Sequence, residues 1–487
     1  MKDIKNMKNI MNLILISFLI FSISLMIFSG SGCAEKVWNG DCVITDEQSL
    51  QALAGCTKVS GSLTIAKTTL ANLDGLGQLT SIGGSLGITY NLSLENLNGL
   101  SNLISVAKWL NISGNKALKN LDGLNNLTSV GGNMHITCNS SLKQINALGN
   151  LTSVGESVEI KKNLSLENLD GLGNLTSVGR NLYIRGDLSL ENLNGLSNLT
   201  SVGGYLYIDN NDTLKNLKGL DNLTSVAGNL HIKWNDTLKS LEGLNNLTSV
   251  GGELHIIANL SLENLDTLGN LTSVGKGYGL AYNSSLENLD GLSNLTSVNG
   301  YLYINDNDFL KNFDGLSNLT SVGGYLHISD NDVLENFVGL GNLTSVGGYF
   351  YVKGNSLLKN FDDLGNLASV GGYMHIDDND ALENFDGLSN LISVGGGLEI
   401  IGNFSIKNFD GLSNLTSVGE YLHIRWNSSL ENINGFGNLT SVAGELHIRS
   451  NQILPTCSAK NYEKQLRNNG WNNLVLIDGN NDSGTCD

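Results

Sequence analysis

Apolar and polar residues follow a two-part pattern over most of the chain, and Ser201 to Thr224 shows one copy of it. Leu206 and Ile208 alternate with polar or aromatic residues, which is typical of a half-buried strand with both aliphatic side chains facing inward. After this strand an aliphatic residue stands at every third position, a spacing that fits neither a straight strand nor a full helix. These residues are Leu214, Leu217, Leu220 and Leu223. The pattern predicts a chain that turns corners and directs one aliphatic side chain inward on each side.

The pattern returns every 24 residues without insertion or deletion. The serine that opens each copy stands at Ser81, Ser105, Ser129, Ser153, Ser177, Ser201, Ser225, Ser249, Ser273, Ser297, Ser321, Ser345, Ser369, Ser393, Ser417 and Ser441. A fixed period of this length indicates a solenoid, in which each unit buries its apolar face only against its neighbours. Because 24 residues are too few for two helices, we predict an all-β fold, a parallel β-solenoid with one coil for each repeat.

Asparagine recurs at two places in each repeat. The first is the position of Asn211, which is asparagine throughout residues 91–451 with Asp187 as the single exception; the second is that of Asn222. An amide side chain offers two donors and one acceptor, so stacked asparagines can satisfy one another and the buried backbone of the turns. The Asn-Leu-Thr triplet also matches the N-glycosylation sequon, which is modified only in a host that has the machinery. We predict a structural ladder of asparagines.

Phenylalanine replaces leucine at the position of Leu217 in five successive repeats. These residues are Phe313, Phe337, Phe361, Phe385 and Phe409. Leucine or isoleucine fills the same place elsewhere, so we expect the rings to face inward and stack from coil to coil rather than to form a second outward stripe.

Composition and charge limit the kinds of partner that this chain can bind. The chain has 59 glycines and a single proline, Pro455, which fits coils whose backbone donors are all needed for pairing. Its formal net charge of −18 disfavours nucleic acid and anionic membrane surfaces. We therefore predict no nucleic-acid partner, and contact with a membrane only through the N-terminus.

Residues 1–32 have the features of a secretory signal. Basic residues precede an apolar run from Ile10 to Phe28, and small residues follow it. The sequence from Gly30 to Cys33 resembles a bacterial lipobox, although Gly30 stands where Leu or Val is usual, so lipidation of Cys33 is one prediction. Cleavage near Ala34, or retention of the apolar run as an anchor, remains open. Each of these readings makes the chain exported, at the cell surface or outer envelope.

The remaining cysteines gather at the two ends of the repeat array. Cys42 and Cys56 flank the segment before the first coil, and Cys457 and Cys486 flank the segment after the last, so we predict two local disulfides and an unpaired Cys138. Short helices beside these pairs are expected to cap the solenoid, because an open end exposes apolar surface. The predicted divisions are a signal peptide (1–32), an N-terminal cap (33–58), the β-solenoid (59–455) and a C-terminal cap (456–487).

The two ends also carry a family resemblance. The motifs are Cys42-Val-Ile-Thr, Leu50, Leu53 and Cys56-Thr-Lys-Val-Ser-Gly-Ser-Leu-Thr-Ile65 at the start, with Leu454-Pro455-Thr456-Cys457, Asp478-Gly479-Asn480 and Gly484-Thr485-Cys486 at the end. Together with the Asn-Leu-Thr-Ser-Val-Gly-Gly-x-Leu-x-Ile units, they resemble the receptor L-domain family, with its leucine-rich-repeat-like coils. The resemblance implies a right-handed β-solenoid related to the L domains of insulin and epidermal-growth-factor receptors and to fungal cell-wall proteins. It carries over no ligand, because this chain has many more coils and no cysteine-rich module.

Outward aromatic residues are the candidate binding site. All seven histidines share the position between the two inward strand residues, and tyrosines share it or stand two residues earlier. In four consecutive repeats both places are aromatic, and these eight residues are the predicted ligand-binding set: Tyr301, Tyr303, Tyr325, His327, Tyr349, Tyr351, Tyr373 and His375. Stacked rings would in any case stabilise the sheet face, but a contiguous exposed aromatic surface is typical of a site for a glycan or protein partner.

The sequence gives weaker evidence for metal binding, calcium binding or catalysis. The pairs His231/His255 and His423/His447 stand on adjacent coils, yet the sequence shows no third metal ligand, so we predict no metal site and no cofactor. Stacked acidic turns such as residues 377–380 could hold calcium, but solvated turns explain them better. No nucleophile elbow, phosphate loop or zincin motif occurs, which favours a protein that is not an enzyme. The predicted function is surface adhesion or recognition; the alternative is a structural envelope protein or spacer.

Overall fold

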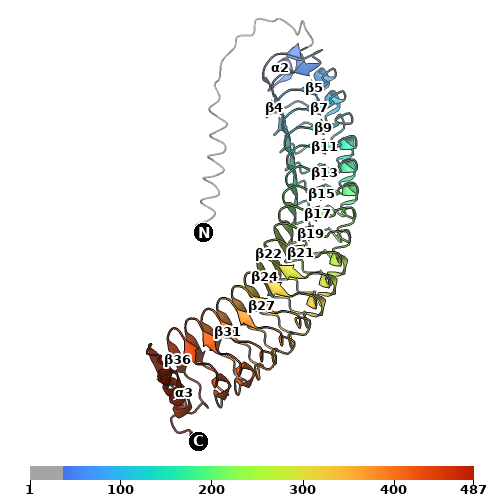
Figure 1. The fold of residues 1–487 in the computed structure, drawn as a ribbon. Helices are drawn as coiled ribbons and strands as arrows, with labels where there is room; N and C mark the ends of the chain where they lie inside the picture. The colour runs from blue at the N-terminus through green and yellow to red at the C-terminus, as the bar shows by residue number, and fades with distance from the viewer. Residues whose placement is uncertain (1–36, 487) are drawn as a thin grey trace.

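The computed structural model describes residues 37–486 and shows one elongated parallel β-solenoid (Figure 1). The predicted leader and Cys33 lie outside the described residues. Among the described residues, no helix is long and apolar enough to cross a membrane. The predicted leucine-rich-repeat-like solenoid of 24-residue coils is confirmed, because backbone and side-chain bonds join residues 24 positions apart along the whole stack.

Two parallel sheets run along the solenoid. The first has 18 short strands, from β1 (Val37–Trp38) and β3 (Lys58–Val59) through β5 (Ser81–Ile82) to β35 (Ser441–Val442). The second sheet is formed by the longer strands, and we call it the long-strand sheet. They are β2 (Cys42–Ile44), β4 (Leu63–Ala66), β6 (Leu86–Thr89), β8 (Leu110–Ser113), β10 (Met134–Thr137), β12 (Val158–Lys161), β14 (Leu182–Arg185), β16 (Leu206–Asp209), β18 (Leu230–Lys233), β20 (Glu253–Ile257), β22 (Gly277–Ala281), β24 (Tyr301–Asn305), β26 (Leu326–Ser329), β28 (Phe350–Lys353), β30 (Met374–Asp377), β32 (Leu398–Ile401), β34 (Leu422–Arg425), β36 (Leu446–Arg449) and β37 (Val475–Asp478).

Equivalent residues of successive coils face each other in these sheets. In the long-strand sheet Leu206 pairs with Leu230 and Tyr207 with His231. The predicted inward residues, including Leu214 and Leu223, have no exposed surface and belong to one continuous core. Every repeat therefore contributes one layer to a core that only its two neighbours complete.

Short 3-10 turns form the third side of many coils, from η1 (Asp74–Leu76) to η10 (Asn434–Phe436). They follow the every-third-residue spacing, which suits a tight turn better than a helix. Figure 1 shows these turns on the outer side of a bend, with β22 and β24 toward its inner side. The bend coincides with the coil of β22, where Tyr278 is buried in the place that aliphatic residues fill in most coils and where glycines occupy both outward positions, at Gly277 and Gly279.

The predicted asparagine ladder is present and buried. Nδ2 of Asn211 donates to the carbonyl of Ile184 at 3.0 Å. The backbone N of Asn211 donates to Oδ1 of Asn235 at 3.0 Å. The second asparagine position also ties coils together, since Nδ2 of Asn222 donates to the carbonyl of Ser197 at 2.7 Å. The bonds of Asn211 satisfy turn groups that would otherwise be buried without partners.

The predicted phenylalanine stack is also inward. Phe361 has no exposed surface, and its ring centroid lies 5.2 Å from that of Phe337 and 5.3 Å from that of Phe385. Phe350 packs edge-on against Phe361 at 6.4 Å, and Phe436 extends the stack beyond Phe409 at 4.9 Å. The rings form a rigid aromatic core beneath the candidate binding face.

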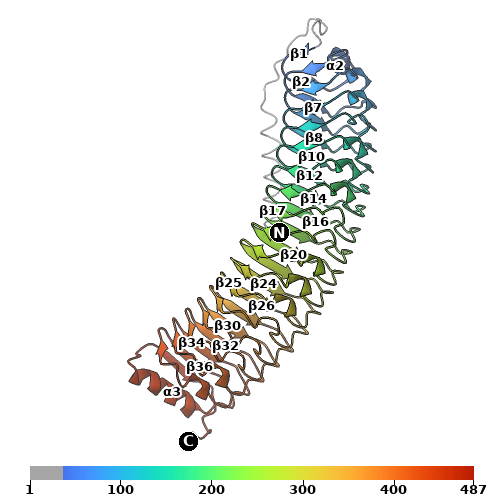
Figure 2. The same ribbon diagram turned by 45° about the vertical axis from the view of Figure 1, so that its right-hand side comes forward.

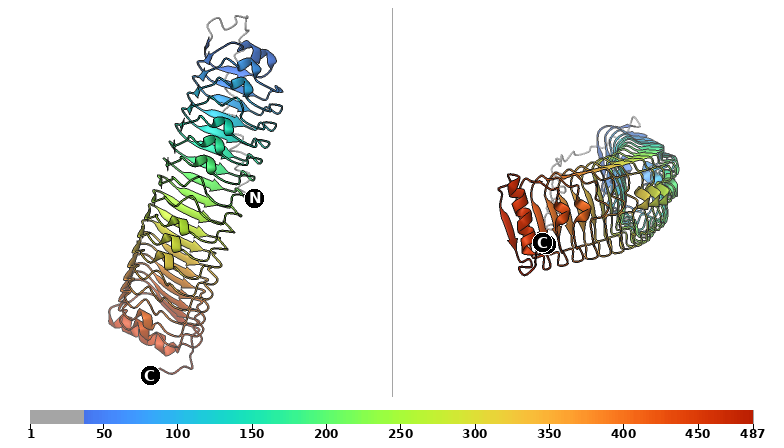
Figure 3. Two further views of the ribbon diagram at one scale, coloured as in Figure 1. Left: turned by 90° about the vertical axis from the view of Figure 1, so that its right-hand side faces the viewer. Right: turned by 60° about the horizontal axis from the view of Figure 1, so that its bottom comes forward.

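A helix stands at each end of the stack, as expected (Figure 2). The helix α2 (Glu47–Ala52) begins at a capping box formed by Asp46 and Ser49. The helix α3 (Thr456–Asn468) buries Tyr462 and Leu466 and lies across the C-terminal end of the solenoid (Figure 3).

The two predicted disulfides have different outcomes. Cys457 and Cys486 are bonded. The predicted Cys42–Cys56 bond is wrong, because Cys42 is a free, buried thiol. Cys42 opens β2, whose alternation turns its side chain into the hydrophobic core, where it packs as a small apolar residue. Cys138 is free and exposed.

Candidate functional site

The eight aromatic residues of the predicted site share the outer face of the long-strand sheet. They lie on, or directly before, the strands β24, β26, β28 and β30. In-register pairing places Tyr303 beside His327, and His327 beside Tyr351. The rings cover one another so closely that Tyr349, at 52%, is the most exposed of the eight.

Ring contacts link neighbouring coils in both outward columns, without a break in the second column and between some coils in the first. The centroids of Tyr301 and Tyr325 are 4.9 Å apart with nearly parallel planes. In the second column His327 lies 4.9 Å from Tyr303 and 4.5 Å from Tyr351. These contacts are the cross-strand pairs that stabilise a sheet face, so part of the aromatic pattern serves the fold itself.

Six of the eight predicted residues line one groove of about 400 Å³, together with Tyr421. We call this the aromatic groove; its lining is Tyr325, His327, Tyr349, Tyr351, Tyr373, His375 and Tyr421. A volume of this size is within the range of small-ligand sites. Tyr301 and Tyr303 do not line the groove.

Tyr301 turns away from the groove because the preceding coil has no outward side chains. Its ring lies over Gly277, where an added Cβ would come within 2.4 Å of it. The hydroxyl of Tyr301 reaches Nε2 of His255, two coils away, at 2.7 Å. The ring thus bridges the gap that Gly277 and Gly279 leave in the aromatic columns.

Tyr421 closes the other end of the groove, and its ring also lies over an outward glycine. Its ring lies over Gly397, where an added Cβ would come within 2.4 Å of it, and stacks on Tyr373 with centroids 5.9 Å apart. The hydroxyl of Tyr373 donates to the carboxylate of Glu420 at 3.0 Å. Tyr421 was not among the predicted site residues; the outward Gly397 in the intervening coil is the sequence feature that could have revealed it.

A carboxylate that the sequence analysis missed lies beside the groove. Glu399 occupies the outward position between His375 and His423 and accepts from Nδ1 of each at 2.8 Å. Arg425 adds a hydrogen bond at 2.9 Å. The hydrogen bonds from His375 and His423 hold the pKa of Glu399 well below its usual range, so the carboxylate stays ionised.

Burial favours the uncharged form of several side chains that line the groove. Burial raises the pKa of the Tyr421 phenol to about 12, and it also raises the pKa of Tyr325 and Tyr351. Burial lowers the pKa of His327, which favours its uncharged form. The site therefore offers ring faces and hydroxyl groups, with Glu399 as a fixed negative charge at one end.

The two histidine pairs acquire a third potential ligand, which corrects the expectation from sequence. Glu253 joins His231 and His255, and Glu445 joins His423 and His447, with all ligand atoms of each group within 4.8 Å of one another. In both, the glutamate stands two residues before the second histidine, on the same outward face, and this Glu-Leu-His pattern could have revealed it.

The acidic turns do not form such a group among the described residues. Asp306, Asp330 and Asp378 have φ values between 50° and 53°, a left-handed turn conformation that Asp and Asn adopt more readily than other non-glycine residues. Solvated turns account for them.

Comparison with known proteins identifies the repeats. A sequence model described as the BspA type leucine rich repeat region matches six copies in this chain, over residues 90–215 and 210–332. No curated protein sequence matches the chain. Among solved structures, an internalin from Listeria monocytogenes is 19% identical; the alignment covers 66% of this chain and 88% of the internalin, with a TM-score of 0.28.

Proposed function

We propose that this chain, which is a leucine-rich-repeat β-solenoid, is an exported surface protein that binds a glycan or protein partner through the aromatic groove. The observation that carries the proposal is the groove itself, where seven rings from neighbouring coils line about 400 Å³ on one face. Tyrosine rings combine a large apolar face with a polar hydroxyl, which suits recognition of both kinds of partner.

The packing beneath the groove supports a binding role. The Phe337, Phe361 and Phe385 stack is fully buried under the same coils, so the groove rests on a rigid base. A surface that is ordered before binding loses little conformational entropy when it meets a ligand. The chemistry is that of a binding protein, and we propose no catalytic role.

The predicted leader and the disulfide support export. Residues 1–32 have a basic segment followed by an apolar one, and Cys457–Cys486 is a bond that persists in oxidising compartments. We propose that the leader, or a lipid on Cys33, holds the protein at the cell surface, and that the divisions 33–58, 59–455 and 456–487 act as cap, solenoid and cap.

A structural role is the second candidate. The ladder position repeats every 24 residues from Asn91 to Asn451 without an inserted loop, which is what a spacer requires. Under this alternative the tyrosines would serve only to stabilise the sheet face.

The experiment compares two sets of tyrosine variants. Purified protein is probed against glycan and protein arrays, and its hits are retested with Tyr325→Ser, Tyr349→Ser and Tyr373→Ser combined. The control combines Tyr183→Ser and Tyr205→Ser, which remove tyrosines from the same sheet face outside the groove. We expect the groove variant to lose binding and the control to keep it. Equal binding by both, or no hit for the wild-type protein, would favour the spacer.

A further inference from the structure

Two histidines and a glutamate lie close together near the C-terminal end of the long-strand sheet. The rings of His423 and His447 stack with centroids 4.2 Å apart and planes within 5° of parallel. The carboxylate of Glu445 lies 3.4 Å from Nε2 of His423 and 3.5 Å from Nε2 of His447. These distances are too long, or too poorly aligned, for hydrogen bonds, since both nitrogens are buried without a partner.

Imidazole lone pairs lie in the ring plane, so two parallel rings reach one ion only if one ring turns out of the stack. His447 is free to do so, because neither of its ring nitrogens has a hydrogen-bond partner. Zinc binds histidine nitrogen and carboxylate oxygen at about 2.0–2.2 Å, so two ligand atoms on one tetrahedral ion are about 3.4 Å apart. The two nitrogen–oxygen distances are close to this value, with Oε1 of Glu445 next to His423 and Oε2 next to His447. Only 7% of His423 is exposed, so its unpaired nitrogen is costly unless something binds it.

A neighbouring carboxylate sets the tautomer of His423. Nδ1 of His423 is 2.8 Å from Glu399, and an ionised carboxylate only accepts, so Nδ1 carries the proton. Nη2 of Arg425 is farther from this Nδ1, at 3.2 Å, and donates to Glu399 at 2.9 Å. The lone pair is therefore on Nε2, which faces Glu445. A histidine ligand whose other nitrogen donates to a carboxylate is the usual outer-shell arrangement at zinc sites.

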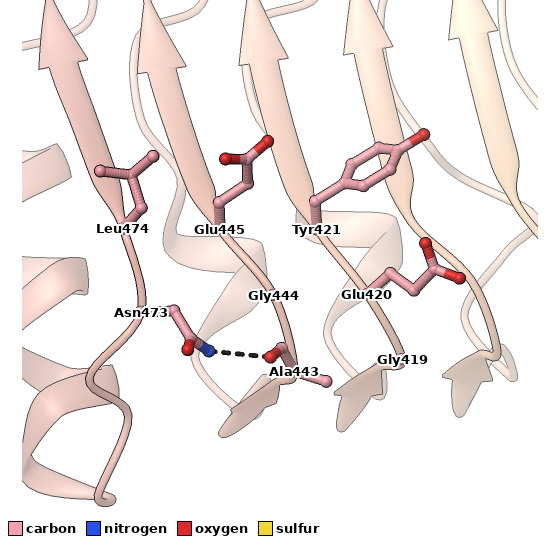
Figure 4. Close-up of a pocket in the computed structure, with 8 residues that line it drawn as sticks. All are labelled: Gly419, Glu420, Tyr421, Ala443, Gly444, Glu445, Asn473 and Leu474. Atoms are coloured by element: carbon pink, nitrogen blue, oxygen red, sulfur yellow. Dashed lines mark hydrogen bonds between the residues drawn. The ribbon is translucent and has the colours of Figure 1, made fainter.

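We propose that His423, Glu445 and His447 form a binding site for a divalent transition-metal ion of the Zn²⁺ class. Two imidazoles and one carboxylate leave a fourth position open, as in sites that keep a water or bind an external ligand. Glu445 borders an open groove of about 510 Å³, which lets an ion and a fourth ligand reach it from solvent (Figure 4). The site adjoins the aromatic groove, since Tyr421 lines both grooves and stacks on His423, but it does not depend on the aromatic groove having a ligand.

A second group of two histidines and a glutamate provides a matched control, because one of its histidines has no lone pair available for a metal. Near the bend, His231, Glu253 and His255 repeat the pattern with nitrogen–oxygen distances of 3.8 and 3.9 Å. There the ammonium of Lys233 lies 2.9 Å from Nδ1 of His255, and ammonium only donates, so Nδ1 accepts and Nε2 carries the proton. Nε2 then donates to the hydroxyl of Tyr301 at 2.7 Å, which leaves His255 no nitrogen for a metal.

The test is zinc binding by untagged full-length protein, measured by equilibrium dialysis and calorimetry after treatment with a chelator. We expect one tight Zn²⁺ per chain and no tight Mg²⁺ or Ca²⁺ binding, because the ligand set is rich in imidazole. Glu445→Gln and His447→Gln should each weaken binding at least tenfold, whereas Glu253→Gln and His231→Gln should leave it unchanged.

Hydrogen exchange tests the location independently of affinity. Added zinc should slow exchange in the coils of β34 and β36 and leave β18 and β20 unchanged, since an ion that binds only the folded state stabilises its surroundings. Glu445 is partly exposed, and circular dichroism should show Glu445→Gln to be folded. No zinc binding by the wild-type protein, binding that survives both Glu445→Gln and His447→Gln, or protection centred on β18 and β20 would each overturn the proposal.

Discussion

Asp187 is the one carboxyl in the buried ladder of asparagines, and changing it to asparagine should alter how stability depends on pH. Its Oδ1 accepts from the backbone N of Asn163 at 2.8 Å and from Nδ2 of the same residue at 3.2 Å. Its Oδ2 is buried without a partner, whereas Asn211 uses Nδ2 to donate to the carbonyl of Ile184. A carboxyl makes an equivalent donation only when protonated, so the protonated form fits the ladder.

The size of the effect follows from the proton affinity. Burial raises the pKa of Asp187 from 3.8 to about 7. Each tenfold change in proton affinity is worth about 1.4 kcal/mol, so this rise corresponds to about 4 kcal/mol. The folded state binds the proton more tightly than the unfolded chain, so stabilisation is full below about pH 4 and is lost as the pH rises to about 7. Asp187→Asn should therefore change little at about pH 4 and stabilise by up to about 4 kcal/mol at about pH 8.

Native-state hydrogen exchange is the suitable assay, because a solenoid opens coil by coil rather than in one step. Opening free energies for the amides of residues 163–211 are compared between wild-type and Asp187→Asn protein at both pH values, after correction for intrinsic exchange rates. Equal protection of the two proteins at about pH 8 would refute the reasoning, since it would mean that the carboxylate is ionised inside the ladder at no cost.

The reverse substitution is the matched control. Asn235 occupies the same ladder position two coils later, where its Nδ2 donates to the carbonyl of Ile208 at 2.9 Å. Asn235→Asp should create, around its own coil, the loss of stability with rising pH that Asp187→Asn removes. A destabilisation that is the same at all pH values would point to packing rather than to ionisation.

Three further predictions concern the core, the groove and the anchor. Phe361→Ala should cost about 3–5 kcal/mol through its cavity and increase hydrogen exchange in residues 313–409 while the ends stay protected; protection as in wild type would contradict the stacked core. Gly397→Ala should push the Tyr421 ring off Tyr373, seen as lost ring–ring nuclear Overhauser effects, whereas Gly87→Ala, whose Cβ meets nothing closer than 4.0 Å, is the neutral control. Cys33→Ser should move the protein from the detergent phase to the aqueous phase if Cys33 is lipidated, and unchanged partitioning would reject lipidation.

Most of the fold was predictable because every coil repeats the same local choices. The alternation around Leu206 assigns inward and outward faces, and the 24-residue period then places like residues beside like residues. The Asn211 ladder and the Phe361 stack follow directly, since each needs only contacts between adjacent coils. The same period predicted that the eight aromatic residues share one face, and in the structure six of them line one groove.

The sequence by itself determined the period, the buried side of each coil and the face that carries the rings, because these depend on neighbours one repeat apart. Only the tertiary structure decided the contacts that do not join adjacent coils. The rings of Tyr301 and Tyr421 lie over outward glycines and contact residues two coils away. The tertiary structure also decided that Glu445 meets both His423 and His447, and that Cys42 stays unpaired in the core. The physical reason is that a long side chain chooses its rotamer from the space its neighbours leave, and that space exists only once the coils are stacked.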